Sequence, residues 1–235
     1  MMTEKPTCLV TGVGPGTGSA LVRRFIEGGY RVAMIARDGE RLAELSASQA
    51  EASSYPCDVS DETALTDTFG RICEDLGAPT VVVHNAVAAE RGTYMEISAR
   101  RLAKAFEVNT IALLHLARLA TPGMLAHGSG AIICTGNTSA YRGKARFAGF
   151  APTKAAQRIL LESIAREAGP KGIHAAYVAI DAVIDLPWTR EAFAGRPDDF
   201  FCKPADIAEE CYRIAHQPKS AWVAEAVIRP FGEPW

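Results

Sequence analysis

The segment Thr11-Gly12-Val13-Gly14-Pro15-Gly16-Thr17-Gly18 lies between a short apolar run, Thr7–Thr11, and a helical pattern across Ala20–Glu27. Glycines in such a turn let the chain reverse tightly and bring its backbone against a pyrophosphate. The helix N-terminus then offers unpaired N–H donors and a partial positive charge. The alternative is a flexible surface loop, but the flanking strand and helix favour a turn that binds a phosphate-bearing ligand.

Short β-branched runs and longer helical patterns alternate along the rest of the chain, which is typical of βαβ units. The runs predict strands at Thr7–Thr11, Tyr30–Ala36, Ser53–Cys57, Val81–His84, Gly130–Thr135, Ile173–Ile180 and Ala221–Arg229. The other patterns predict helices at Ala20–Glu27, Glu40–Ser48, Asp61–Leu76, Ile97–Ala120, Phe150–Ala168 and Lys203–His216. Right-handed crossovers join these elements into an α/β fold, a doubly wound parallel sheet of about seven strands with helices on both faces.

The predicted elements take up nearly all of residues 1–235, so we expect a single domain. Residues 185–203 contain Pro187, Gly195 and Pro197, which predict an irregular, partly helical segment. We expect this segment to form a lid over the ligand. Its aromatic residues would line an apolar substrate pocket or pack beneath the loop; they are Trp188, Phe193, Phe200 and Phe201.

The composition favours a small molecule as the main partner. Of 235 residues, 48% are hydrophobic, and 25 Lys and Arg against 27 Asp and Glu give a formal net charge of -2. A chain of this length buries roughly 70% of its unfolded surface, which argues against disorder. The absence of a Lys/Arg cluster argues against nucleic acid or an anionic membrane, because phosphate binding requires a dense positive face.

The sequence carries no secretion, membrane or metal signal. The N-terminal stretch MMTEKPTCLVTG has an apolar run shorter than a signal-peptide core, and no segment has the apolar length of a membrane helix. A cytoplasmic location is therefore expected. The six cysteines form no C-x-x-C pair and the five histidines show no ligand spacing, so no metal site is predicted.

The glycine turn resembles that of one enzyme family. Thr11, Gly12, Gly16 and Gly18 reproduce T-G-x-x-x-G-x-G, the pattern of the short-chain dehydrogenases/reductases. The resemblance implies a Rossmann-type fold and an NAD(P)(H)-dependent oxidoreductase that acts on a small carbonyl or alcohol substrate.

Later motifs extend the resemblance from Thr7 to about Arg229. Cys57-Asp58-Val59 resembles the family's Asp-Val after the third strand, His84-Asn85-Ala86-Val87 its N-N-A-G after the fourth, and Asn109 its helix asparagine. The cofactor-binding residues that the resemblance implies are Gly12, Gly16, Thr17, Gly18, Asp58, Val59, Asn85, Lys154 and Val183.

The end of the second strand bears on the choice of cofactor. A carboxylate there would bind the ribose hydroxyls of NAD and repel the extra phosphate of NADP. This chain has Ala36 and then Arg37. Because a guanidinium binds phosphate through two hydrogen bonds, we expect NADP(H) in preference to NAD(H). The alternative is that Arg37 is a solvated residue at the start of a helix, and that the neighbouring Asp38 competes with the phosphate for its guanidinium.

The catalytic positions depart from the family. Its Y-x-x-x-K motif is matched by Phe150-Ala151-Pro152-Thr153-Lys154, so Phe150 stands where the family has its proton-donating Tyr. Thirteen residues earlier, Asn137 stands where the family has Ser. Asn109 and Lys154 remain. Tyr141 and Ser139 do not fit the register of the missing groups.

Other polar residues near these positions allow two interpretations each. Asp181 and Asp185 would carry protons beside the cofactor, or cap the turn after the sixth strand. The basic run Arg142, Lys144 and Arg146 would recognise a carboxylate, or form a solvated loop.

Two functions therefore compete. In the first, the chain is an NADPH-dependent reductase in which Asn137, Lys154 and a water, or an acid such as Asp185, stabilise the developing oxyanion. In the second, it is a catalytically impaired NADP-binding sensor or interaction protein. A methyltransferase fits poorly, because Ala36 occupies the place of the acid that would hold the ribose.

The resemblance also implies a homodimer or homotetramer through the helices at 97–120 and 150–168.

Overall fold

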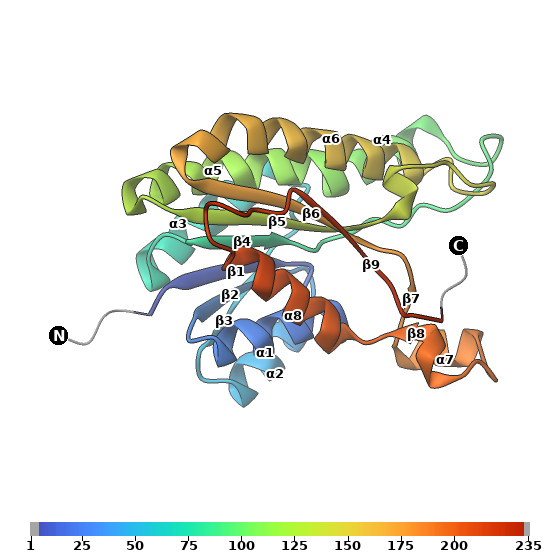
Figure 1. Cartoon of the computed structure of the whole chain (residues 1–235), viewed down its shortest axis with the longest axis horizontal. Helices are drawn as coiled ribbons and strands as arrows, with labels where there is room; N and C mark the ends of the chain where they lie inside the picture. The colour runs from blue at the N-terminus through green and yellow to red at the C-terminus, as the bar shows by residue number, and fades with distance from the viewer. Residues whose placement is uncertain (1–4, 233–235) are drawn as a thin grey trace.

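The computed structural model describes residues 5–232 and confirms the predicted α/β fold. One parallel sheet of seven strands has the order β3-β2-β1-β4-β5-β6-β9 (Figure 1). The strands are β1 Thr7–Thr11, β2 Arg31–Ala36, β3 Ala52–Pro56, β4 Val81–His84, β5 Gly130–Asn137, β6 Ile173–Ile180 and β9 Glu225–Ile228. Every residue of β1, β4 and β6 is buried, which explains why these strands are continuous apolar runs without alternation.

Helices cover both faces of the sheet and bury two separate cores. The helices are α1 Thr17–Glu27, α2 Gly39–Ser48, α3 Glu62–Leu76, α4 Ala99–Phe106, α5 Ala112–His127, α6 Ala151–Ala168, α7 Pro187–Ala192 and α8 Pro204–Ala215. The cores form because α3, α5 and α6 pack on one face and α1, α2 and α8 on the other. Polar side chains cap the N-termini of α2, α3 and α4. The capping residues Asp38, Asp61 and Ser98 each accept a hydrogen bond from the backbone N–H three residues on.

The long helix predicted for Ile97–Ala120 differs from the structure in two ways. It is divided into α4, a π-helical turn at Glu107–Ile111, and α5. The predicted stop at Thr121-Pro122-Gly123 is wrong, because α5 continues to His127 with Pro122 inside it and ends at Gly128, where φ is 79°. The buried side chain of Met124 keeps this last part of α5 on the core, which offsets the hydrogen bond that Pro122 cannot donate.

The segment between β6 and α8 projects from the sheet beside the carboxyl ends of the strands (Figure 1). It contains two short paired strands, β7 Val183–Ile184 and β8 Phe201–Cys202, with α7 and the 3-10 turn Asp198–Phe200 between them. The aromatic rings of Phe193, Phe200 and Phe201 lie side by side, with centroids 5.6 and 5.1 Å apart. These contacts pack α7 and the 3-10 turn against β8.

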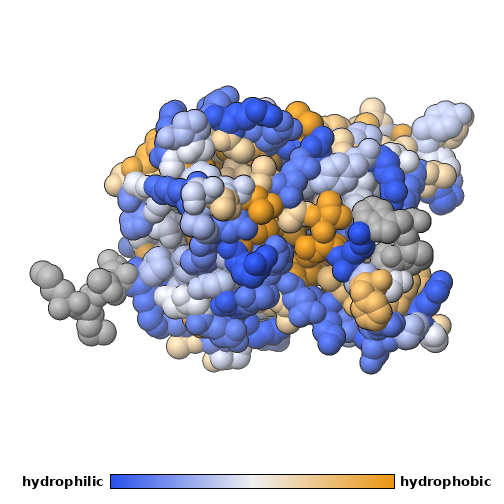
Figure 2. Space-filling model, in the orientation of Figure 1, coloured by the Kyte–Doolittle hydropathy of each residue, from blue (hydrophilic) through white to orange (hydrophobic). Residues whose placement is uncertain are grey.

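The surface of the face drawn in Figure 1 is mostly hydrophilic, with a group of hydrophobic residues near its centre (Figure 2). Val227 of the edge strand β9 is 46% exposed. Across the described part of the chain, every helix is too short or too polar to cross a membrane.

Candidate active site

The glycine turn is held against the end of β4. Gly12 has a φ of 67°, and a Cβ there would lie 2.5 Å from the Cα of Ala86, so only glycine fits. The amide of Asn85 donates to the carbonyl of Gly12 at 2.9 Å and accepts from the Thr135 hydroxyl at 2.9 Å. Asn85 thereby fixes the turn to the ends of both β4 and β5.

The start of α1 has no side-chain cap. Gly16 precedes the helix, and the first turn contains no acidic residue. The Thr17 hydroxyl is buried and has no hydrogen-bond partner in the described part of the protein. Buried polar atoms are nearly always paired, and this hydroxyl is free to bind a ligand at the glycine turn. A pyrophosphate fits this hydroxyl and the positive end of the helix.

A cavity of about 630 Å³ extends from this turn along the carboxyl ends of β1, β2 and β3. Arg37, Asp58 and Val59, which the sequence analysis assigned to cofactor binding, all line this cavity. The competitor Asp38 pairs with Arg41 at 3.1 Å, and no carboxylate within residues 5–232 forms an ion pair with Arg37. Arg37 is therefore available to an anion.

Asp58 is held as a carboxylate at the edge of this cavity. It accepts hydrogen bonds from the Ser60 N–H at 3.0 Å and the Ser60 hydroxyl at 2.7 Å. Burial alone would raise the pKa of Asp58, but these two hydrogen bonds, together with the nearby charges of Lys104 and Arg37, bring the pKa below its usual value.

Phe150 directly precedes α6 and lies next to the turn that carries Lys154. Its ring is buried, and Lys154 Nζ lies 5.8 Å from the ring centroid. Lys154 Nζ donates to Gln157 Oε1 at 2.8 Å and to the Thr135 carbonyl at 3.4 Å. Burial lowers the pKa of Lys154.

The Asn109 side chain binds only protein groups next to the candidate site. Its side chain accepts from the Ala88 N–H at 2.9 Å and donates to the Ala88 carbonyl at 3.0 Å and the Thr153 hydroxyl at 2.8 Å. Its carbonyl accepts a hydrogen bond from the Gln157 side chain. The π-helical turn containing Asn109 therefore connects to Lys154 through Gln157, a fully buried residue that the sequence reasoning missed. Gln157 follows Lys154 by three residues on α6, and this spacing places the two side chains next to each other on a helix.

Asn137 ends β5 beside a buried phenol. Its backbone N–H donates to the Tyr177 hydroxyl at 3.3 Å, and its side chain accepts from the Ser139 N–H at 3.0 Å. Tyr177 was not among the predicted site residues. Because burial raises the pKa of Tyr177 above its usual value, that phenol holds its proton firmly. Tyr141 donates to Glu225 on β9, so its hydroxyl is also occupied.

The two acids after β6 have different partners. Asp185 binds Arg190 through two hydrogen bonds of 2.6 and 2.8 Å, which lower the pKa of its carboxyl and make it a poor proton donor. Asp181 accepts a hydrogen bond of 2.6 Å from the Thr138 hydroxyl, at the end of the neighbouring strand β5. Neither carboxylate caps a helix in this structure.

The segment after β6 reaches back over the glycine turn. Val183 lies in β7, and a Cβ placed on Gly16 would lie 2.5 Å from a terminal methyl carbon of Leu186. Leu186 therefore packs directly on the backbone of the turn, and it was not among the predicted site residues.

His84 is a structural residue. It is fully buried at the end of β4, where its ring nitrogens lie 3.0 Å from the Thr11 hydroxyl and 3.1 Å from the Val108 carbonyl. Burial first, and then the charge of Lys154, lower the pKa of His84 to about 3. In the described part of the chain, no three His, Cys, Asp or Glu side chains gather as a metal site.

Comparison with known proteins places this geometry among dehydrogenases. The family model for short chain dehydrogenases matches residues 6–191. A 3alpha-hydroxysteroid dehydrogenase of Mediterraneibacter gnavus is 27% identical over 199 residues, which cover 80% of this chain and 79% of that protein.

Two solved structures extend the similarity to nearly the whole chain. A short-chain dehydrogenase from Rhodopseudomonas palustris has 31% identity and a TM-score of 0.82, over 96% of this chain and 99% of its own. A metagenomic short-chain oxidoreductase in complex with NADP has 26% identity and a TM-score of 0.82, over 96% and 97% of the two chains.

Proposed function

The chain belongs to the short-chain dehydrogenase family, and on that premise we propose that it is an NADP(H)-dependent oxidoreductase acting on a small carbonyl or alcohol substrate. The observation that carries the proposal is the turn at 12–18, where glycine is required and a buried hydroxyl lacks a partner. The similar oxidoreductase solved with NADP supports the same cofactor.

The proposed cofactor site uses the residues that the sequence suggested. Gly12, Gly16, Thr17 and Gly18 bind the pyrophosphate, and Asp58 and Val59 contact the adenine. Arg37, which lines the cavity, binds the 2′-phosphate, because a guanidinium can bind a phosphate group through two hydrogen bonds. Asn85 holds the turn in place, Lys154 binds the ribose hydroxyls, and Val183 offers its backbone N–H to the carboxamide.

The cofactor, when bound, supplies or accepts a hydride, and the remaining chemistry falls to this chain's own side chains. The Asn137 amide orients the substrate oxygen, and Lys154 Nζ holds positive charge near it. Because burial lowers the pKa of Lys154, its ammonium gives up a proton more readily than an exposed lysine does. A water next to Nζ passes that proton to the oxygen. Asn109 is a positioning residue, since its side chain binds only protein groups.

Residues 185–203 form a lid in this proposal, because Leu186 places the segment on the glycine turn. The helices α5 and α6 form the interface of a homodimer or homotetramer. They leave Ile159 exposed at 49% and Leu125 at 41%. An interface would bury such side chains.

Thermal unfolding tests the cofactor assignment. Binding to the native state alone at 100 times Kd adds about 2.7 kcal/mol, which for a chain of this size raises Tm by roughly 5–10 °C. NADPH should give this rise, NADH a smaller one and S-adenosylmethionine none. Arg37→Ala should reduce the NADPH shift to that of NADH, while Arg23→Ala, an exposed residue of α1, should not. Equal shifts for NADPH and NADH in the wild type would contradict the NADP preference.

A catalytically impaired sensor is the second candidate, favoured by the buried ring of Phe150 at the position that the sequence analysis aligns with the family's Tyr. Loss of a general acid costs about 10² to 10⁴ in rate, so weak turnover persists in the first proposal and none occurs in the second. NADPH oxidation by the wild type over a panel of aldehydes and ketones decides between them. Phe150→Tyr should raise the rate, because the new hydroxyl would lie beside Lys154.

A further inference from the structure

A second cavity, of about 590 Å³, opens beside the catalytic positions. Ser139 in its wall lies two residues after Asn137, and Ala151 follows Phe150 directly. The volume is that of a site for a small organic molecule. We refer to it as the loop pocket, because residues 139–148 form most of its lining.

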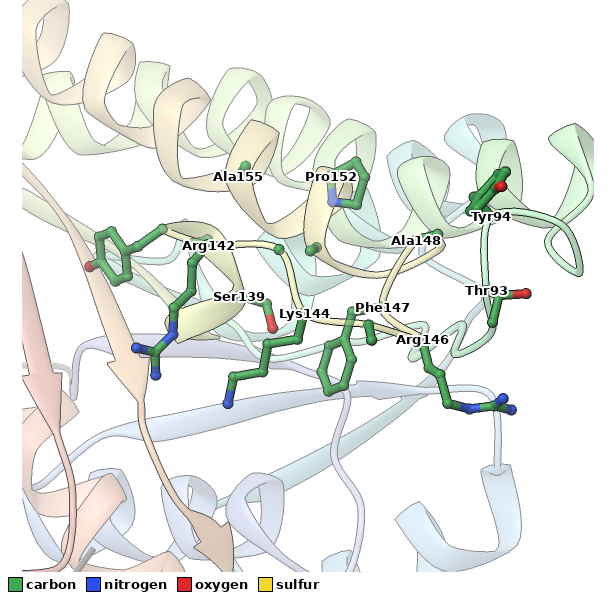
Figure 3. Close-up of a pocket in the computed structure, with 15 residues that line it drawn as sticks. Thr93, Tyr94, Ser139, Arg142, Lys144, Arg146, Phe147, Ala148, Pro152 and Ala155 are labelled. Atoms are coloured by element: carbon green, nitrogen blue, oxygen red, sulfur yellow. The ribbon is translucent and has the colours of Figure 1, made fainter. Parts of the chain in front are cut away.

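One side of the loop pocket is apolar. Pro152 and Ala155 from α6 form a wall together with Ala151, and Tyr94 stands at the other end with its side chain 82% exposed (Figure 3). These surfaces suit the hydrocarbon part of a ligand, because a ligand would remove them from water.

The other side of the loop pocket carries three cations. Arg142, Lys144 and Arg146 extend from the loop in the direction away from Pro152 and Ala155 (Figure 3). Arg146 lies 3.8 Å from Glu96. Within residues 5–232, no carboxylate pairs with Arg142 or Lys144. In a chain with a net charge of -2, two cations at one cavity without counter-charges favour an anion.

The loop that carries these cations is held in a strained conformation. Arg146 has a φ of 65°, a value that non-glycine residues rarely adopt. Its carbonyl accepts a hydrogen bond of 2.9 Å from the Gly92 N–H, and the Ala148 N–H donates to the Gly92 carbonyl at 3.3 Å. A solvated loop needs no such anchoring, since strain persists only where surrounding contacts impose it. These two hydrogen bonds fix the backbone at the end of the loop that leads into α6.

We propose that the loop pocket binds an anionic substrate, with its apolar body against Pro152 and Ala155 and its carboxylate or phosphate on Arg142 and Lys144. This inference rests on the proposed function, because the pocket adjoins the positions of Asn137 and Phe150. It makes the substrate an amphipathic carbonyl or alcohol compound with one acidic group. A neutral compound of the same shape would leave both cations unpaired.

Matched ligands test the proposal by calorimetry, with and without NADPH. The probes are 4-oxo-4-phenylbutanoate, its neutral methyl ester, and 4-phenylbutyl phosphate. Charge-assisted hydrogen bonds predict that the acid binds about tenfold more tightly than the ester at low salt. Salt at 0.5 M should reduce this difference. The tighter of the two anions identifies carboxylate or phosphate as the recognised group.

Variants assign the effect to the loop. Arg142→Ala combined with Lys144→Ala should weaken acid binding about tenfold and leave ester binding unchanged; both side chains are exposed, so folding is retained. Lys144→Arg should keep the affinity, as should Arg23→Ala on α1. Equal binding of acid and ester, or an unchanged acid affinity in the double variant, would overturn the proposal. If NADPH raises Tm but no anion binds, this inference fails and the proposed function stands. If the acid binds and NADPH does not, the loop pocket binds an anion but the proposed function fails.

Discussion

Lys154 and Thr17 show what single residues contribute at this site. The buried Lys154 ammonium donates hydrogen bonds to the Gln157 side chain and to the Thr135 carbonyl. Thr17 has the opposite condition, a buried hydroxyl that the protein leaves unpaired. The Lys154 ammonium thus has acceptors within the protein, whereas the Thr17 hydroxyl has no partner within residues 5–232.

Replacing Gln157 should change the protonation of Lys154. Gln157→Leu removes the acceptor at 2.8 Å, so the pKa of Lys154 should fall further, whereas Gln157→Glu adds a negative charge and should raise that pKa. The alkaline limb of the pH profile for NADPH oxidation should therefore move to lower pH in the first variant and to higher pH in the second. A purely structural role for Gln157 would lower stability in both variants and leave that limb in place.

Replacing Thr17 should affect the ligand and spare the fold. Thr17→Val removes a hydroxyl with no protein partner, so the free energy of unfolding of the free protein should stay the same or rise. NADPH should bind about threefold to tenfold more weakly, the usual value of one hydrogen bond. Thr17→Ser should restore binding. Calorimetry and urea unfolding provide the two measurements, and an NADPH affinity equal to that of the wild type would refute the assignment.

The elements differ in how far the sequence could predict them. The β1, turn and α1 unit was predictable because its signals are local: an apolar run, glycines with required positions, and a helix after them. The continuation of α5 past Pro122 was not, because burial of Met124 decides it. The bond between Gln157 and Asn109 spans 48 residues, and Leu186 meets Gly16 across most of the chain, so neither contact has a local signal.

The contact of Leu186 with Gly16 predicts how the segment after β6 is held down. Gly16→Ala would place a methyl group 2.5 Å from Leu186, forcing that side chain away. Amide hydrogen exchange across 183–203 should then rise in the free protein. Gly14→Ala is the matched control, because no heavy atom lies within 4 Å of its added carbon. In a Leu186→Ala background, Gly16→Ala should add nothing. Unchanged exchange in the single Gly16→Ala variant would show that the segment is held by other contacts.

The whole molecule should lose stability in mild acid because of His84. The folded-state pKa of about 3 lies below the usual 6.5, so between these values the unfolded chain binds a proton that the folded chain does not. The free energy of unfolding therefore falls as the pH drops from about 6.5 toward 3, by about 2 kcal/mol between pH 7 and pH 5.

A variant distinguishes the contribution of His84 to acid sensitivity from that of the carboxylates. Several of these, such as Asp185 and Glu162, also have lowered pKa values, but they titrate below about pH 5. Urea unfolding of His84→Asn should show a lower free energy of unfolding at pH 7, because the hydrogen bonds to Thr11 and Val108 are altered. That free energy should also change less between pH 7 and pH 5 than it does in the wild type. If the slope over that range were the same in the variant and the wild type, the acid sensitivity would arise elsewhere, and His174, whose pKa burial also lowers, would be the next residue to replace.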